Sequence, residues 1–163
     1  MRPPRPDRSA ASEADERTVR TAALALLAGR DFGRQELAAR LTRKGFPPAH
    51  IAAVLDQLTA AKLLSEARFV EQFIRQHAAR GQGPVRIRLE LSQRGVETEA
   101  VEEALAASGE DWVAAAREAR RRKFGVALPG DFRQRAKQAR FLQYRGYSAE
   151  QVRAALRPGD DAD

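Results

Sequence analysis

The sequence predicts an all-α protein built from three tandem three-helix repeat units, stacked into an elongated, curved array. The main observation is a repeated motif, a basic residue followed by glycine, at Lys44-Gly45, Arg94-Gly95 and Arg145-Gly146. The glycines are 50 and 51 positions apart, and each has a leucine four residues before it and another ten residues after it. A repeat of this period indicates an array of one supersecondary unit. In addition, no stretch shows the sustained alternation of a β-strand.

The repeat motif also indicates the domain organisation. The segment before the first unit is rich in Pro, Arg, Ser and acidic residues, so it has little apolar surface to bury and is predicted to be disordered. The segment after the last unit is acidic. The predicted parts are an arm at residues 1–16, repeats at residues 17–64, 65–108 and 109–157, and a tail at residues 158–163.

Apolar residues at helical spacing predict three helices in each unit. In the first helix, near residues 17–28, Leu24 and Leu27 are expected to face the core. The glycine of each motif follows the second helix of its unit, where a helix C-terminus favours a positive φ. Gly45, Gly95 and Gly146 are therefore predicted to be structural turn residues. Further helices are expected near residues 34–44, 65–80, 111–124, 131–145 and 148–156, with others after Pro47, Pro84 and Gly95.

Basic residues are concentrated in the third unit. The chain has a net charge of +7, but residues 111–157 hold twelve basic against four acidic side chains, whereas residues 65–108 hold six against seven. Such a surface suits a phosphate or an acidic partner, although charged helix faces often only contact water. The basic band predicted to bind a partner or DNA comprises Arg117, Arg120, Arg121, Arg122, Lys123, Arg133, Lys137, Arg140 and Arg145.

Aromatic residues are interleaved with the end of this basic band. Phe141, Tyr144 and Tyr147 could stack on nucleic-acid bases. Their helical spacing beside Gly146 instead favours packing in the core and between units. We therefore expect these three side chains to be structural.

Other functional classes lack the residues that they need. The chain has no cysteine and only two histidines, His50 and His77, which we expect at surface or boundary positions. No apolar run reaches the roughly 18 residues of a membrane helix. The segment 81–84 has two glycines but lacks the lysine of a phosphate loop, so it is predicted to be a turn between helices. We predict no catalytic residue, no metal and no cofactor, and a cytoplasmic protein that is not an enzyme.

Several of these segments resemble the RecX family of bacterial regulators. The resemblance covers approximately residues 18–157, in order and at the spacing of the family, whereas the arm before it matches nothing. The residues that carry it are Glu36-Leu37, Leu41, Lys44-Gly45, Phe69, Phe73-Ile74, Gly81-Gln-Gly83-Pro84, Ile87, Leu91-Ser-Gln-Arg94-Gly95, Arg122-Lys-Phe124-Gly, Arg135-Ala-Lys-Gln-Ala-Arg140 and Phe141-Leu-Gln-Tyr-Arg-Gly-Tyr147.

The resemblance implies a non-enzymatic negative modulator of the RecA recombinase. Members of the family bind RecA filaments on single-stranded DNA, lie in the helical groove, and inhibit filament extension, ATP hydrolysis, strand exchange and the co-protease activity that triggers the SOS response. We therefore expect a monomer whose partners are the RecA filament and single-stranded DNA, bound directly or through the filament, with no membrane partner. The alternative is a tandem helix-turn-helix DNA-binding regulator, because three-helix units with basic helices also dock in major grooves.

Overall fold

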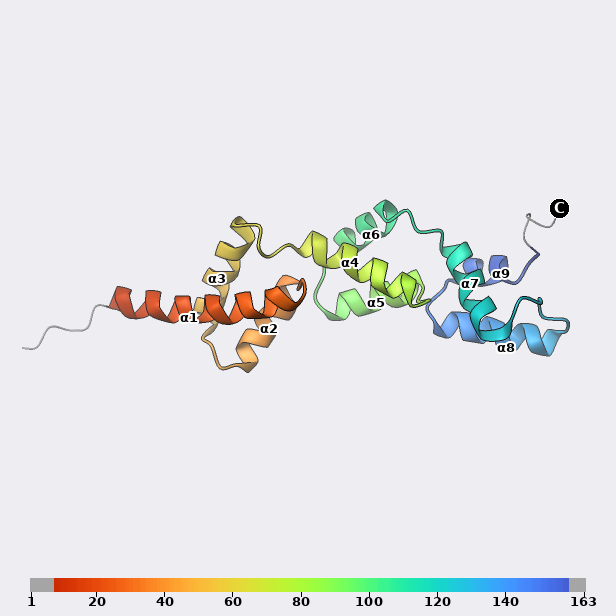
Figure 1. Ribbon diagram of the computed structural model, residues 1–163, viewed down its shortest axis with the longest axis horizontal. Helices are drawn as coiled ribbons and strands as arrows, with labels where there is room; N and C mark the ends of the chain where they lie inside the picture. Colours follow the sequence, from red (N-terminus) through yellow and green to blue (C-terminus); the bar gives the residue numbers. More distant parts are fainter. Residues whose placement is uncertain (1–7, 159–163) are drawn as a thin grey trace, which may run out of the picture. The chain divides into compact units, whose positions relative to one another are not determined.

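The computed structural model describes residues 8–158, and in this range the chain forms nine α-helices and no strand (Figure 1). The prediction of an all-α protein is confirmed for these residues. The acidic tail lies outside them except for Pro158. The helices are α1 (Arg8–Gly29), α2 (Arg34–Arg43), α3 (Pro48–Ala60), α4 (Glu66–Ala79), α5 (Pro84–Gln93), α6 (Thr98–Ala107), α7 (Trp112–Phe124), α8 (Phe132–Tyr144) and α9 (Ala149–Ala155).

The chain divides into two compact units. The N-terminal unit comprises the residues up to Phe69 together with Arg94–Val96, and the C-terminal unit comprises Val70–Gln93 and the residues from Glu97 onward. The division passes through α4. The predicted repeat boundaries, after residues 64 and 108, instead lie in the segments that join α3 to α4 and α6 to α7.

The core of the N-terminal unit is formed where α1 and α2 pack on α3. Val19 and Ala23 are the fully buried residues of α1, whereas Leu24 and Leu27 are only partly buried at the edge of this core. Leu24 and Leu27 thus pack against the core as expected, but the centre of the inner face is at Val19 and Ala23. The buried residues that complete the core are Phe32, Leu37, Leu41, Ile51, Val54, Leu55, Leu58 and Leu64.

Helix α1 begins earlier than the sequence suggests. The arm at residues 1–16 was predicted to be disordered, but the structure shows helix from Arg8, and residues 1–7 lie outside the described range. Alanine and glutamate in this segment favour helix, and the last proline is at position 6. Contacts with α3 also hold it, because the Gln57 side chain donates a hydrogen bond to the Glu16 carboxylate at 3.2 Å. A polar composition therefore does not exclude a helix that extends from a packed one.

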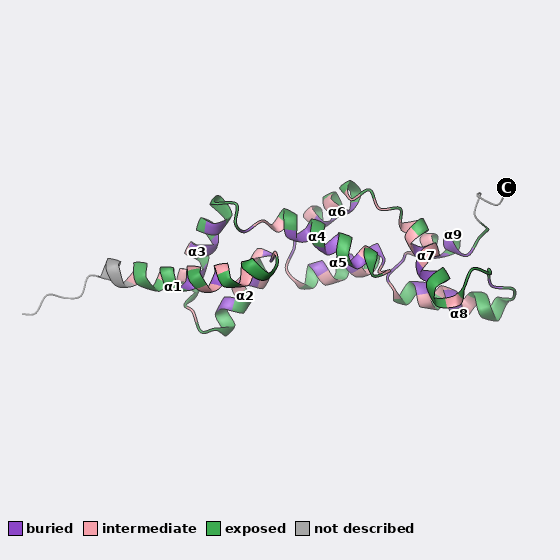
Figure 2. Cartoon of the chain, in the orientation of Figure 1, coloured by how far each residue is buried: buried purple, intermediate pink, exposed green. Residues whose placement is uncertain are grey.

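In the C-terminal unit, α5 packs on α6, and α7 packs on both α8 and α9. Figure 2 shows buried faces on these helices and an α8 whose N-terminal part is mostly exposed. The core around α7 contains Ala116, Leu142 and Tyr147. The main buried apolar residues of α4, α5 and α6 in this unit are Val70, Phe73, Ile74, Ile87, Leu91, Val101 and Leu105.

The three repeat turns share one backbone conformation. Gly45, Gly95 and Gly146 have φ values of +89°, +78° and +92°, as the motif predicts. At the last turn the Gly146 N–H donates to the Gln143 carbonyl and the Tyr147 N–H donates to the Leu142 carbonyl. This pair of bonds is the Schellman motif, which satisfies carbonyls at the end of the helix.

Within the C-terminal unit, the turn at Gly146 packs against the loop between α4 and α5. The Gly83 N–H donates to the Arg145 carbonyl at 2.8 Å, and the Val85 N–H donates to the Gly146 carbonyl at 2.9 Å. A Cβ atom on Gly83 would lie 2.5 Å from the Tyr147 nitrogen. Glycine is therefore needed at position 83 because two backbones approach closely, not because of its φ.

Candidate functional site

Helix α7 supplies the first half of the predicted basic band. Its N-terminus is capped by Asp111, whose carboxylate accepts a hydrogen bond from the Ala114 N–H at 2.9 Å. The inner face buries Ala116, Ala119 and Arg120, so the basic residues of this helix are divided between the core and the surface.

Arg120 is a core residue, and its prediction as part of a surface band is wrong. Only 5% of the residue is exposed. Its guanidinium donates to the carbonyls of Ala127 at 2.9 Å and Val126 at 3.0 Å, and to the Gln138 side chain at 3.3 Å. Arg120 therefore holds the connection between α7 and α8 and cannot meet a partner.

Arg117 also turns inward. It is half-buried, and its guanidinium donates to the Ala154 carbonyl at 3.4 Å, near the end of α9. A cation there interacts favourably with the negative end of the α9 dipole. Arg117 and Arg120 were predicted to share a surface line with Arg121, but the structure assigns them to packing.

The exposed cations of α7 are Arg121, Arg122 and Lys123. Arg121 and Arg122 both pair with Glu118, at 2.6 Å and 2.9 Å. The hydrogen bond from Arg122, together with the charge of Arg121, lowers the pKa of the Glu118 carboxyl. Lys123 makes no ion pair within the described residues, so its ammonium group is available to an anion.

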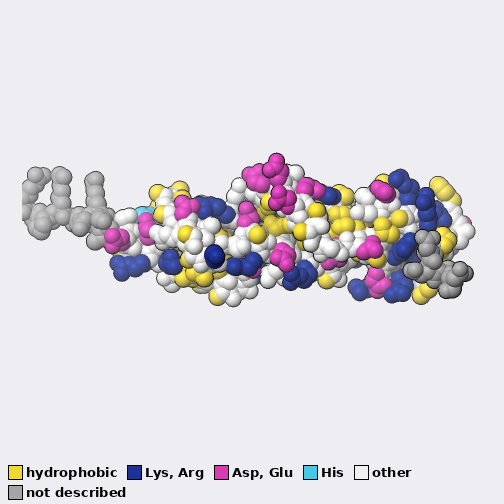
Figure 3. Space-filling view, turned by 90° about the horizontal axis from the view of Figure 1, so that it is seen from above, with side chains coloured by type: hydrophobic (Ala, Val, Ile, Leu, Met, Phe, Trp, Pro, Cys, Tyr) yellow, Lys and Arg dark blue, Asp and Glu magenta, His cyan; other side chains and the backbone are white. Residues whose placement is uncertain are grey.

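Helix α8 presents the second half of the band. Arg133, Lys137 and Arg140 are all exposed, at positions one or two turns apart, and none makes an ion pair in the part of the chain that the structure describes. Tyr144 continues this line and is 86% exposed. The expectation that Tyr144 packs inside is therefore wrong. Figure 3 shows Lys and Arg side chains gathered over the end of the C-terminal unit where α7 and α8 lie.

The remaining predicted residues lie where α8 meets α7 and α4. Phe141 is half-buried and packs edge-on against Phe124, with ring centroids 5.2 Å apart. The Arg145 guanidinium lies 5.3 Å from the Phe141 ring centroid and donates to the Arg80 carbonyl at 3.5 Å. Tyr147 is 3% exposed, so the expectation of a packed side chain is confirmed for this tyrosine.

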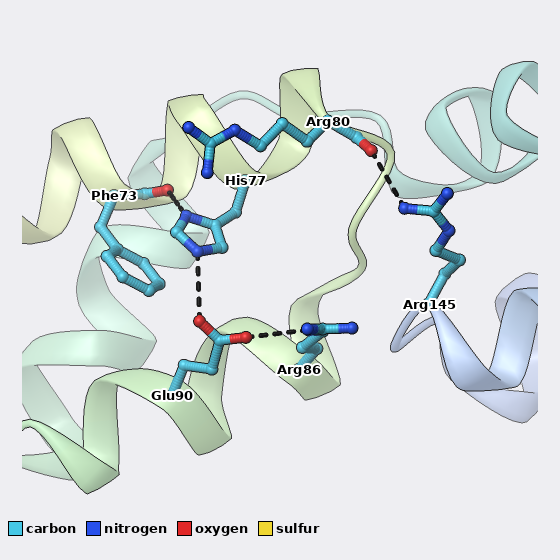
Figure 4. A network of polar contacts seen from close by, with 6 residues as sticks. All are labelled: Phe73, His77, Arg80, Arg86, Glu90 and Arg145. Atoms are coloured by element: carbon cyan, nitrogen blue, oxygen red, sulfur yellow. Dashed lines mark hydrogen bonds and ion pairs between the residues drawn. The ribbon is translucent and has the colours of Figure 1, made fainter.

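His77 was expected at the surface or at a boundary, but it is buried near the end of α4. Figure 4 shows its ring stacked on Phe73 and pointing toward Glu90 on α5. The ring nitrogens lie 2.8 Å from the Phe73 carbonyl oxygen and 3.2 Å from a Glu90 carboxylate oxygen. A hydrogen bond from Arg86, together with the charge of His77, lowers the pKa of Glu90. The network joins α4 to α5 beside the loop that carries Gly83.

These helices bring together a cleft that the sequence did not predict. It lies in the C-terminal unit between the last turn of α4, α7 and α8, and Arg80, Lys123, Phe141 and Arg145 contribute to its walls. The sequence does not single out Arg80, because this residue lies in the second repeat, whereas the excess of basic residues lies in the third. No group of three metal-ligating side chains occurs within residues 8–158, and no described helix is long and apolar enough to cross a membrane.

Family models match the chain in three places. The first three-helix domain of RecX matches residues 20–58, the second matches residues 65–105 and the third matches residues 109–156. The chain belongs to the RecX family. The prediction of three tandem three-helix units, made from the basic-glycine motif, is confirmed, and each RecX domain contains one of the three motif glycines.

Relatives named regulatory protein RecX match over nearly the whole chain. The one from Halorhodospira halophila is 49% identical over 154 residues, which cover 94% of this chain and 93% of the relative. The one from Pseudomonas savastanoi pv. phaseolicola is 48% identical over 145 residues, which cover 88% of this chain and 94% of the relative. The chain therefore resembles RecX regulators over their full architecture, not over one domain.

Two solved structures share the fold. The crystal structure of RecX from Lactobacillus salivarius aligns with a TM-score of 0.70 at 21% identity and covers 88% of this chain and 96% of that one. A second crystal structure of regulatory protein RecX aligns with a TM-score of 0.71 at 18% identity and covers 94% of this chain and 79% of that one. At these identities the likeness concerns the fold alone.

Proposed function

We propose that this chain is a negative modulator of the RecA recombinase. It binds RecA filaments on single-stranded DNA along their groove and inhibits filament extension, ATP hydrolysis, strand exchange and co-protease activity. It acts in the cytoplasm as a monomer and catalyses no reaction of its own. The observation that carries this proposal is the match of all three RecX domains, in order, over residues 20–156.

The distribution of charge supports a polymeric, negatively charged target. The exposed cations of α8 and Lys123 of α7 are free of ion pairs within the described residues, and cations of this kind suit phosphates or carboxylates. Repeats in tandem can contact successive subunits of a filament. Such contacts change the filament only if they are stronger in one of its conformations, and they need no catalytic group.

The composition of the helices argues against the alternative, a tandem helix-turn-helix regulator. In that motif the second of two consecutive helices enters the major groove. In this protein, that recognition helix would be the third helix of each unit. Neither α3 nor α6 contains a lysine or arginine, and α6 carries three glutamates. Only Arg153 is basic in α9. The corresponding helices therefore lack the side chains that phosphate and base contacts require.

The direct test is the single-stranded-DNA-dependent ATPase activity of RecA, measured with substoichiometric amounts of this protein. We expect the rate to fall well below that of RecA alone. A reaction without RecA controls for ATPase activity of the protein itself. An unchanged RecA rate, together with tight binding to one duplex sequence, would instead favour the helix-turn-helix regulator.

A variant tests the role of the α8 cations. Replacing Arg133, Lys137 and Arg140 together with alanine should weaken filament binding and flatten its dependence on salt, because each cation that contacts a phosphate releases a counterion. All three side chains are exposed, so circular dichroism should show an unchanged fold. Equal affinity and equal salt dependence in the folded variant would show that these cations only face solvent.

A further inference from the structure

The cleft between the last turn of α4, α7 and α8 has the shape of a small ligand site. Its volume is about 290 Å³, near the lower end for small-molecule sites. Gly81, Ala115 and Ala119 are small residues that leave the space open, and Phe141 provides an aromatic wall. A planar group of the size of one nucleobase suits this space.

The charges around the α4–α7–α8 cleft favour an anion. Arg80, Arg122, Lys123 and Arg145 line it, and its one carboxylate is Glu118. Glu118 is already matched by its ion pairs with Arg122 and with Arg121. Arg80 and Lys123 have no carboxylate partner among the described residues. An entering group therefore meets unpaired cations beside an aromatic ring.

Phe141 is held in a fixed orientation. Phe124 packs edge-on against it at an interplanar angle of 90°, and the Arg145 guanidinium lies over it. A fixed aromatic ring can stack on a base without reading its identity, because every base has a π-face. The residues that leave the space open are alanine and glycine, whose side chains form no hydrogen bonds to base edges. The charged side chains that also line the cleft would contact phosphates or one another, so only alanine, glycine and Phe141 would face the base, and binding would not depend on its identity.

We propose that the α4–α7–α8 cleft binds one nucleotide of a single-stranded nucleic acid. The base enters against Phe141, and its phosphate lies near Lys123 and Arg80. Lys137 is one turn before Phe141 on α8, so the neighbouring phosphates follow the exposed cations of that helix. The inference deepens the proposed function and rests on it only for the source of the strand, since this contact needs no RecA.

Two other ligands fit the cleft less well. A duplex keeps its bases stacked and paired, so no base is free to enter. An acidic peptide would satisfy the cations of the cleft, but its backbone offers no flat apolar face to Phe141 and the alanines. A base presents a largely apolar face to the same residues.

The test is fluorescence anisotropy of a labelled 20-nucleotide poly-dT strand titrated with the full chain in the absence of RecA. Ala115→Leu fills the cleft without changing the charge, and we expect it to weaken binding about tenfold. Phe141→Leu removes the stacking partner and should also cost about tenfold. Lys123→Ala should reduce the slope of log K against log salt by about 0.7, the share of one phosphate contact on a single strand.

The matched control is Arg153→Ala, which removes one exposed cation of α9 in the same unit. It should leave the affinity within twofold of the original. Circular dichroism melting of each variant establishes that it is folded. Polyglutamate of equal total charge should displace the strand poorly, because it offers no base.

Three results would overturn the proposal. The first is unchanged affinity in folded Ala115→Leu and Phe141→Leu, the second is equal loss in Arg153→Ala, and the third is displacement by polyglutamate as effective as by poly-dT. The RecA ATPase assay separates this inference from the proposed function. If the protein suppresses the RecA ATPase but does not bind poly-dT, nucleotide binding in the cleft is contradicted, whereas the proposed function as a RecA modulator still stands.

Discussion

The turns at Gly45 and Gly146 have nearly the same backbone but very different surroundings. Both are Schellman turns, with φ of +89° and +92° at the glycine. In each turn, the N–H groups of the glycine and of the residue after it donate hydrogen bonds to carbonyls of the helix that the turn ends. A Cβ atom on Gly45 would have no atom within 4 Å, whereas one on Gly146 would lie 2.7 Å from the Arg86 nitrogen. The same local sequence thus forms a free turn in one place and a packed one in the other.

The difference shows that the repeat motif has two separable roles. The glycine ends its helix in every repeat, and this role depends only on neighbouring residues. At Gly146 the turn also accepts the loop that carries Gly83, through two backbone hydrogen bonds. The loss of unfolding free energy when each glycine is replaced therefore indicates how closely other segments pack against its turn.

The largest effect is expected from Gly146→Ala compared with Gly45→Ala. The positive φ alone should cost about 1–2 kcal/mol of unfolding free energy at either position. At Gly146 the overlap with Arg86 should add about 1–3 kcal/mol. Urea unfolding can be followed by circular dichroism for the whole chain and by the fluorescence of Trp112, the single tryptophan, for the C-terminal unit. Equal losses at the two positions would contradict the distinction.

A slightly smaller effect is expected on the other side of the same contact. Gly83 does not have a positive φ, so Gly83→Ala tests close approach alone. We expect a loss of about 1–3 kcal/mol from overpacking, measured by Trp112 fluorescence in urea. Gly130→Ala is the control, because its Cβ would meet nothing within 4 Å and its φ is not positive. If the two variants unfold at the same urea concentration, the backbones at Gly83 and Gly146 are not in tight contact.

An intermediate case is the turn at Gly95 in the N-terminal unit. Its Cβ would meet the Gln35 side chain, including the Gln35 Cβ atom at 3.0 Å. A side chain can move where a backbone cannot, so Gly95→Ala should cost more than Gly45→Ala and less than Gly146→Ala. Adding Gln35→Ala should recover most of the excess over Gly45→Ala in the same circular dichroism assay. No recovery in the double variant would show that the side chain is not the obstacle.

The smallest effect concerns the residue after the glycine, which is Phe46 in the first turn and Tyr147 in the last. The Tyr147 hydroxyl is buried and has no hydrogen-bond partner among the described residues. Tyr147→Phe should therefore leave stability unchanged or raise it by about 1 kcal/mol at neutral pH. A loss of stability in this variant would show that the hydroxyl has a partner.

The same tyrosine makes the C-terminal unit sensitive to alkaline pH. Burial raises the pKa of Tyr147 to about 12, above the unfolded value of about 10. The folded state therefore holds the Tyr147 proton more tightly than the unfolded state does. The stability that this difference contributes to folding is complete below pH 10 and is lost as pH rises toward 12. In an alkaline titration, absorbance at 295 nm should show a late phase of tyrosine ionisation, and Tyr147→Phe should remove that phase. A single phase in both proteins would contradict this.

Much of the fold could be predicted because it depends on local sequence. The ends of α2, α5 and α8 follow from a basic residue and a glycine, and the start of α9 follows from Ser148 and Gln151, which form a capping box. The missed segment was the start of α1, where polar composition suggested disorder although alanine and glutamate favour helix. Composition indicates how much apolar surface a segment can bury, whereas helix propensity indicates whether the segment can form a helix.

The candidate site was predictable only in part. The cations of α8 are exposed as expected, but Arg120 lies in the core because the loop after α7 offers it two carbonyl acceptors. Tyr144 and Tyr147 are three residues apart and have opposite environments, 86% and 3% exposed. The repeat motif separates them, because Tyr147 follows its glycine as Phe46 and Val96 do. Tyr144 instead takes the place of the polar Arg43 and Gln93 in the other two repeats.

By itself, the sequence determined that this protein is helical, that it has three units, and that each unit has a glycine turn at the end of its second helix. These properties depend on residues within a few positions of one another, and the motif repeats them. Only the tertiary structure decided which turn is packed, which arginine is buried and where the cleft lies. Those outcomes depend on contacts between segments far apart in the chain, and equivalent positions in different repeats have different neighbours.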